Sequence, residues 1–188
     1  MVFAFGKNEV IFCQEKDYFL CGDGSCDFVL NEDNMCMWHP HDGMLIYVSS
    51  DHKRIIDIIR YYVDVPTELN TVNLNGFYTE ICRVFDKLRY TPKDGHYGFY
   101  IIIADNKSAY DVSGNGIVTE IDKRSAIAGE YANYGSGVCS MMPVNMPAKE
   151  KLITYYKEVG KYRHKNYFPL VLMSTKNKKI EVIEAPEK

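Results

Sequence analysis

The stretch over residues 98–129 constrains the fold of this 188-residue chain most strongly. Residues 99–104 are almost entirely apolar, and a polar turn separates them from a second apolar run at residues 109–112. A glycine-containing turn then leads to residues 117–121, in which apolar side chains occupy alternate positions. The pattern predicts an antiparallel meander of three strands. A meander of this kind needs a layer of structure on each face to bury it.

The rest of the chain predicts those layers. Apolar runs of strand length, separated by short turns, span residues 2–5, 10–13, 18–21, 35–38, 44–48, 168–174 and 179–183. Apolar residues at helical spacing predict helices over residues 51–63, 76–89 and 148–161, and a glycine-weakened helix is expected over residues 131–142. A polar connection is expected over residues 67–75.

The order of these elements decides the fold class. Strands are followed by two helices, more strands, two more helices and final strands, without the alternation of strand and helix that builds a parallel sheet. No period of roughly 20–50 residues repeats, which excludes a solenoid. We therefore expect an α+β fold, a four-layer αββα sandwich of two antiparallel sheets flanked by helices. The length suits a single domain over residues 1–188.

Composition excludes several classes of function. The formal net charge is −3, and the longest basic cluster, residues 176–179, is expected to be a solvated turn, so nucleic-acid binding is not predicted. The N-terminus lacks the pattern of a signal peptide, and no apolar stretch approaches the roughly 20 residues that span a bilayer. A soluble cytoplasmic protein without membrane contact is expected. In that compartment the six cysteines are expected to be reduced.

Three short motifs, taken in order, resemble motifs of a known family. Cys21-Gly22-Asp23-Gly24 is similar to the AGDG that ends the second strand in the proteasome β-subunit family of N-terminal-nucleophile hydrolases. Ile102-Ile103-Ala104-Asp105, followed by Ser113-Gly114-Asn115-Gly116, is similar to the family's IVAD hairpin and SGNG turn. Ser125-Ala126-Ile127-Ala128-Gly129, with Asn133-Tyr134 after it, is similar to the AIGSGGNYA segment that opens the third helix. The ordered set covers most of the chain and most closely resembles the bacterial HslV peptidase, which implies the same four-layer sandwich.

The resemblance implies a catalytic site that can be compared residue by residue. In the family, a threonine at the mature N-terminus attacks the peptide carbonyl, and its own α-amino group acts as the base. An aspartate and a lysine adjust the electrostatics, and a backbone N–H beside a glycine stabilises the oxyanion. Asp23 matches the aspartate, and Gly129 lies in the expected oxyanion-hole region. Where the lysine is expected, residues 34–39 contain none, and Cys36 and His39 occupy the neighbourhood.

The nucleophile of the family has no counterpart in this sequence. An ungapped count back from Asp23 places the nucleophile on Lys7, at a Gly6-Lys7 junction, whereas a gapped alternative places it at Met1-Val2. Neither position supplies a hydroxyl or a thiol. Cleavage before Cys13 would expose a thiol but would also remove the first strand. The serine within the family's AIGSGGNYA segment has no clear counterpart either, because Ala128-Gly129-Glu130-Tyr131 runs through that position. The resemblance therefore implies a retained fold with lost threonine peptidase chemistry.

A zinc site is the alternative reading of the cysteine and histidine residues near the N-terminus. Thiol and imidazole side chains are zinc ligands. The spacing lacks the Cys-x-x-Cys pairs typical of zinc sites, so packing and turn roles are favoured and no metal or cofactor is expected. The residues concerned are Cys21, Cys26, Cys36, His39 and His41.

Aromatic residues on the expected helices predict contacts with other protein chains. Tyrosine is enriched where proteins meet partners, and the expected helices carry Tyr61-Tyr62, Tyr155-Tyr156, Tyr131 and Tyr134. The other interpretation is that these rings cover the edge of the core. The resemblance implies a homo-oligomer, in the form of a ring, with an ATPase or another protein as partner.

Three hypotheses for the function follow. The first is a self-assembling, proteasome-like protein without threonine peptidase activity that acts as a scaffold, a binding protein or an inhibitor. The second is an active peptidase or amidohydrolase of the N-terminal-nucleophile type with atypical processing of its N-terminus. The third is a zinc-binding module.

Overall fold

Two antiparallel sheets form the middle of the molecule. The computed structural model describes residues 1–15, 18–20, 28–31, 35–91, 96–123, 137–138, 141–143 and 145–185. A four-stranded sheet has the order β1-β2-β10-β11, and a seven-stranded sheet has the order β3-β4-β5-β6-β7-β8-β9. The strands are β1 Val2–Gly6, β2 Glu9–Glu15, β3 Tyr18–Leu20, β4 Phe28–Asn31, β5 Met35–Trp38, β6 Met44–Ser50, β7 Phe99–Asp105, β8 Ala109–Ser113, β9 Val118–Glu120, β10 Leu170–Ser174 and β11 Asn177–Ile183.

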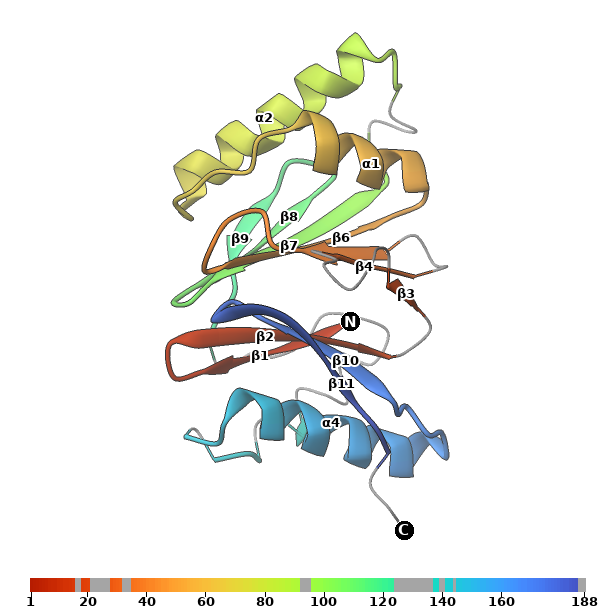
Figure 1. The fold of residues 1–188 in the computed structure, drawn as a ribbon. Coiled ribbons are helices and arrows are strands. Elements are labelled where there is room, and N and C mark those ends of the chain that lie inside the picture. Colours follow the sequence, from red (N-terminus) through yellow and green to blue (C-terminus); the bar gives the residue numbers. More distant parts are fainter. Residues whose placement is uncertain are drawn as a thin grey trace.

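Helices cover the outer face of each sheet. Figure 1 shows α1 (Lys53–Tyr62) and α2 (Thr71–Lys87) on the seven-stranded sheet, and α4 (Ala148–Arg163) on the four-stranded sheet. The expected α+β sandwich of two antiparallel sheets flanked by helices is confirmed. Of the helix expected over residues 131–142, residues 137 and 138 are described as helical, and residues 131–136 and 139–140 lie outside the described residues. Among the described helices, none is long and apolar enough to cross a bilayer.

The central meander forms as the sequence predicts. Strands β7, β8 and β9 are consecutive neighbours in the seven-stranded sheet. The turn between β7 and β8 is closed by Asp105, whose Oδ1 accepts hydrogen bonds from the backbone N–H groups of Lys107 and Ser108, both at 2.7 Å. This use of an aspartate side chain is a common way to stabilise a tight turn.

Helix α2 begins earlier than its apolar pattern predicts. The Asn70 side chain accepts a hydrogen bond from the backbone N–H of Asn73 at 2.9 Å, so Asn70 caps a helix that starts at Thr71. The expected start at residue 76 is wrong, and so is most of the expected polar connection over residues 67–75. In the first turn of α2, Leu74 is fully buried but the other apolar residue, Val72, is 80% exposed, so the apolar pattern alone does not reveal this turn.

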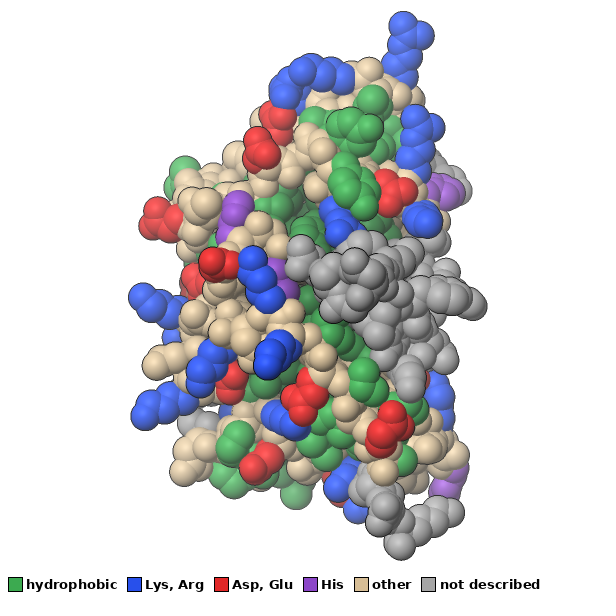
Figure 2. All heavy atoms as spheres, in the orientation of Figure 1, with side chains coloured by type: hydrophobic (Ala, Val, Ile, Leu, Met, Phe, Trp, Pro, Cys, Tyr) green, Lys and Arg blue, Asp and Glu red, His purple; other side chains and the backbone are tan. Residues whose placement is uncertain are grey.

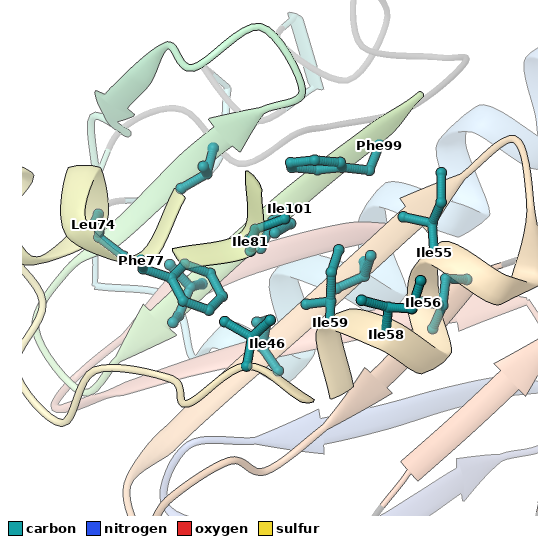
Figure 3. Close-up of a cluster of buried hydrophobic side chains, with 14 of the residues drawn as sticks. Ile46, Ile55, Ile56, Ile58, Ile59, Leu74, Phe77, Ile81, Phe99 and Ile101 are labelled. Carbon is teal, nitrogen blue, oxygen red and sulfur yellow. The ribbon is translucent and has the colours of Figure 1, made fainter. Parts of the chain in front are cut away.

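Three apolar clusters follow the layers of the molecule. The helix-facing cluster lies between the seven-stranded sheet and helices α1 and α2, and Figure 3 shows Ile46 and Ile101 of that sheet among side chains of both helices. The inter-sheet cluster includes Phe12 of β2 and Ile102 of β7. The α4 cluster lies between α4 and the four-stranded sheet and contains the fully buried Tyr155. Its members are Val2, Ala4, Ile11, Cys13, Ala148, Leu152, Tyr155, Tyr156, Val159, Tyr167, Leu170 and Leu172.

The β10–β11 turn of one sheet and the β5–β6 turn of the other lie at the same end of the sandwich. Lys178, the second residue of β11, forms an ion pair with Asp42, in the β5–β6 turn, with 2.9 Å between Nζ and Oδ1. We call the end of the sandwich that holds this ion pair the turn end. Because Val2 pairs with Cys13 and Gly6 pairs with Glu9, β1 starts at the opposite end, which we call the N-terminal end. Figure 1 shows the N-terminus between the two sheets.

Candidate functional site at the N-terminal end of the sandwich

The start of β1 carries apolar side chains. Met1 precedes Val2, the first residue of the strand, and the Met1 side chain packs against the inter-sheet cluster. Burial lowers the pKa of the Met1 α-amino group, because the charged form loses solvation. Gln14, which follows the strand partner of Val2, lies at the same end of the hairpin and is buried. No described residue forms a hydrogen bond with its Oε1 atom.

The structure places Lys7 at the far end of β1 from Met1. Lys7 and Asn8 form the turn between β1 and β2, where Asn8 has a positive φ of 57°. The Lys7 side chain is exposed to solvent. The residues at the start of the first strand are therefore Met1-Val2, the position given by the gapped alternative. The other two sequence-derived site residues, Asp23 and Gly129, lie outside the described residues.

A row of four residues crosses the seven-stranded sheet at the N-terminal end. Met35, Ser49, Tyr100 and Ser113 are register neighbours on β5, β6, β7 and β8. Register neighbours present their side chains on the same face. Met35 and Tyr100 pack against the inter-sheet cluster, so all four side chains face the four-stranded sheet. In β5, the strand expected to supply a lysine, the residues facing that sheet are Met35 and Met37.

The described histidine and cysteine residues have separate surroundings. Cys36 is buried in the helix-facing cluster. His39 Nδ1 lies 2.9 Å from the Met44 carbonyl oxygen, and His41 Nε2 lies 2.7 Å from the Val65 carbonyl oxygen. These contacts give the histidines roles in fixing a hairpin turn and in joining it to the α1–α2 connection. Within the described parts of the chain, no three His, Cys, Asp or Glu residues are grouped to hold a metal, and Cys21 and Cys26 lie outside them.

A hollow of about 510 Å³ opens at the same end of the seven-stranded sheet. One side of the hollow is formed by the tight turn that precedes β7, in which the Phe99 N–H donates to the Tyr97 carbonyl oxygen at 2.7 Å. The Gly98 carbonyl oxygen accepts hydrogen bonds from Asp51 N (3.0 Å) and Ser50 Oγ (2.7 Å), which fix the end of β6 beside this turn. The lining residues are Ser49, Ser50, Asp51, His96, Tyr97, Gly98, Phe99, Tyr100, Ser113, Gly114 and Asn115.

Two glycines allow the chain segments around the hollow to approach closely. A Cβ atom on Gly98 would lie 2.2 Å from Asp51 Oδ2, and one on Gly114 would lie 1.7 Å from the Tyr97 carbonyl oxygen. Both distances are far below van der Waals contact. The sequence pattern predicts a turn at residues 113–116 but does not reveal the hollow. The sequence does contain the two glycines and Ser49-Ser50-Asp51. Their proximity follows only from the register of β6, β7 and β8, which the sequence pattern does not give.

Tyr100 joins the hollow to the interior of the sandwich. Its hydroxyl donates to Asp111 Oδ2 at 3.4 Å. Desolvation raises the pKa of Tyr100, and the negative charge of Asp111 raises it further. Asp111 Oδ1 is a second buried acceptor, besides Gln14 Oε1, that forms no hydrogen bond with any described residue. This end of the molecule thus offers hydroxyl, carboxylate and amide groups, but its described residues place no nucleophile at the start of β1.

Comparisons with known proteins show the fold. No family model matches the sequence, and no curated protein matches it. Among solved structures, BPH from Thiobacillus denitrificans has a TM-score of 0.61 at 12% identity, over 99% of this chain and 98% of its own. Anbu (ancestral β-subunit) from Yersinia bercovieri has a TM-score of 0.58 at 11% identity, over 97% and 86%. Eukaryotic HslV from Trypanosoma brucei has a TM-score of 0.54 at 8% identity, over 92% and 97%.

Proposed function

We propose that this chain, which has the proteasome-like fold of the N-terminal-nucleophile hydrolases, has no threonine peptidase chemistry and works as a self-assembling scaffold, binding protein or inhibitor. The observation that carries the proposal is the sequence Met1-Val2-Phe3 at the start of β1. N-terminal-nucleophile catalysis needs a hydroxyl or thiol on the residue whose α-amino group acts as the base. A thioether has no proton to give up and cannot form the acyl intermediate.

The surroundings of Met1 support the loss of chemistry. The lowered pKa of the Met1 α-amino group favours the neutral amine, so a base is present without a nucleophile beside it. The side chains of β5 that face the four-stranded sheet, Met35 and Met37, carry no charge. A lysine at this end would stabilise negative charge that develops during acyl transfer. The proposal extends to Asp23 and Gly129, which we regard as remnants of the family's site.

Cys13 does not restore an active hydrolase. Its side chain is fully buried in the α4 cluster, and the Tyr156 hydroxyl donates to the Cys13 carbonyl oxygen at 3.4 Å. Burial raises the pKa of the Cys13 thiol, and the protonated thiol is a poor nucleophile. These observations favour the pseudoenzyme over a hydrolase with atypical processing. The described thiols of Cys13, Cys36 and Cys82 are not in disulfides, which supports our proposal of a cytoplasmic location.

Intact-mass measurement after exposure to epoxomicin tests the loss of chemistry. Epoxomicin is bound in a structure of the BPH protein from T. denitrificans, which therefore serves as the positive control. We expect the mass of this chain to stay unchanged, with Met1 or Val2 as its first residue. A mass increase by one inhibitor, or a mature N-terminus that begins with Thr, Ser or Cys, would overturn the proposal in favour of an active hydrolase. Metal analysis of the same sample tests the zinc module, which requires bound zinc.

Exposed apolar side chains support self-assembly. Figure 2 shows hydrophobic side chains at the surface over α1 and α2, next to Lys and Arg side chains. Tyr61 and Tyr62 are each 64% exposed, and Val72 of α2 is 80% exposed. Tyr155 and Tyr156 are buried in the α4 cluster and add nothing to this surface, and Tyr131 and Tyr134 lie outside the described residues. Large exposed apolar side chains of this kind mark protein interaction surfaces when they gather.

Native mass spectrometry tests assembly and, separately, the proposed ring and ATPase partner. We expect a homo-oligomer at micromolar concentration, and the number of subunits gives the ring size. Tyr61→Ser together with Tyr62→Ser is expected to shift the distribution toward smaller species. A strictly monomeric wild-type chain under these conditions would refute self-assembly.

A further inference from the structure

We propose that the hollow beside Asp51 binds an organic ammonium group that has a carbonyl or carboxylate close to it, the chemistry of a free amino acid or of a polypeptide N-terminus. The inference rests on the hollow alone. It holds whether or not the chain has lost peptidase chemistry, so failure of one proposal leaves the other standing.

The Asp51 carboxylate lines the hollow and has no cationic partner among the described residues. Its backbone N–H donates to the Gly98 carbonyl oxygen at 3.0 Å, and its carboxylate lies directly over the Gly98 Cα, where a Cβ would collide with it. No described residue forms an ion pair or a side-chain hydrogen bond with this carboxylate. The backbone hydrogen bond keeps Asp51 at the rim of the hollow, and its carboxylate, unpaired within the described part of the chain, can turn toward a cationic ligand there.

The other residues of the hollow suit the rest of such a ligand. Tyr97 and Tyr100 add aromatic surface, which attracts organic ammonium groups as well as apolar side chains. Ser49 and His96 supply donors for a carbonyl oxygen near the ammonium group. Asn115 uses its Oδ1 to accept from Ser113 Oγ and from the Ile117 N–H, which leaves its Nδ2 group as a further donor.

Other ligand classes fit the hollow less well. An isolated anion would face the Asp51 carboxylate without a described lysine or arginine in the lining. A divalent metal would need several carboxylate, imidazole or thiolate ligands grouped together, and the described residues contain no group of three. A neutral apolar ligand would leave the carboxylate without a partner. An ammonium group with an adjacent acceptor satisfies both the carboxylate and the donors.

Isothermal titration calorimetry with three probes tests the proposal on the full chain. The probes are L-phenylalanine, the tripeptide Phe-Gly-Gly and its N-acetylated form. We expect one or both of the first two to bind, and acetylation to weaken binding of the tripeptide at least tenfold, because it removes the charge. Binding of free phenylalanine identifies an amino-acid site, whereas binding of the tripeptide alone identifies a site for polypeptide N-termini.

A pair of isosteric variants assigns the binding to Asp51. Asp51→Asn is expected to weaken binding of the preferred probe at least tenfold, whereas Asp64→Asn, an exposed aspartate that follows α1, is the matched control and is expected to change it less than twofold. Asp51 is exposed and its backbone hydrogen bond does not use the carboxylate, so the variant should fold, which circular dichroism checks. Equal binding of the free and acetylated peptides, equal effects of the two variants, or no binding of any probe at millimolar concentration would overturn the proposal.

Discussion

At the residue scale, Gly98 and Gly114 allow the chain segments around the hollow to approach closely. Each lies where another backbone segment or side chain occupies the space of a Cβ atom. At Gly114 the obstacle is a backbone carbonyl oxygen, which cannot move without displacing the strand, whereas at Gly98 it is the Asp51 carboxylate, which can rotate away. The two positions therefore differ in what a methyl group would cost.

Alanine substitutions at glycine should separate these cases. Gly114→Ala is expected to lower the free energy of unfolding by about 2–3 kcal/mol, because β7 and β8 must move apart. Gly76→Ala is the control, since it lies inside α2 with open space around its Cα. It is expected to raise stability by about 0.8 kcal/mol through helix propensity. Urea denaturation measures both, and equal effects of the two variants would contradict the described geometry.

The buried thiol of Cys13 predicts a loss of stability in alkali. Its folded-state pKa is raised, so its contribution to stability is complete below the unfolded thiol pKa of about 8.5 and falls as pH rises above that value. The loss has a maximum slope of about 1.4 kcal/mol per pH unit. Between pH 8 and pH 10, Cys13→Ala should lose less stability than the wild type in urea titrations. Parallel pH profiles for the two proteins would show that the thiol ionises equally in both states.

At the scale of elements, helix α2 has two apolar residues close together in the sequence whose burial, and therefore whose expected contribution to stability, differs. Leu74 is fully buried against the sheet, and Val72, two residues earlier on the same helix, is 80% exposed. Leu74→Ala is expected to destabilise the protein by about 2–4 kcal/mol through the lost contacts and the cavity. Val72→Ala should change stability by less than about 0.5 kcal/mol. Thermal unfolding compares the two, and similar losses would place both residues in the core.

Elements with strong apolar patterns were predictable from the sequence, and elements defined by polar groups were not. The meander was predicted because β7 is apolar along most of its length and Asp105 marks the turn after it. The first turn of α2 was missed because its signal is the side chain of Asn70, and asparagine is also a common loop residue. Composition along the chain cannot distinguish these two uses of asparagine.

The candidate site was harder to predict than the elements that form it. The sequence shows that Met1-Val2 has no side-chain hydroxyl or thiol. The ungapped count back from Asp23, however, places the nucleophile position on Lys7. The structure shows that β1 and β2 join in a tight turn at Lys7, so strand length decides which residue stands at the N-terminal end. The hollow depends on register between β6, β7 and β8, which brings Asp51 to Gly98 across 47 residues of sequence.

At the scale of the whole molecule, the inter-sheet cluster contains buried side chains from both sheets. We propose that residues 1–188 form a single domain and that both sheets unfold together. Phe12 is fully buried in the inter-sheet cluster from β2, and Trp38, the one tryptophan of the chain, is buried in the helix-facing cluster. Trp38 fluorescence therefore reports on the seven-stranded sheet, although Phe12 belongs to the other sheet.

A destabilising substitution in the four-stranded sheet should also lower the urea midpoint reported from the seven-stranded sheet. Phe12→Leu is expected to lower stability by about 1 kcal/mol, through the loss of ring volume from the core. The urea midpoint from Trp38 fluorescence should shift by the same amount as the midpoint from far-ultraviolet circular dichroism. A shift in the circular dichroism signal without a shift in the fluorescence would show that the two sheets unfold independently.

The ion pair between Lys178 and Asp42 marks one end of the sandwich, and the hollow lies at the other end. The ion pair joins the two sheets at the turn end, so the N-terminal end with the hollow is a distinct pole of the molecule. In any ring built on one rotation axis, all copies point the same way, and their hollows form a single circle. When two such rings stack through two-fold axes, the circles either face each other across a shared chamber or open outward on both faces. The stacking of rings, rather than any residue of the hollow, would then control which ligands reach it.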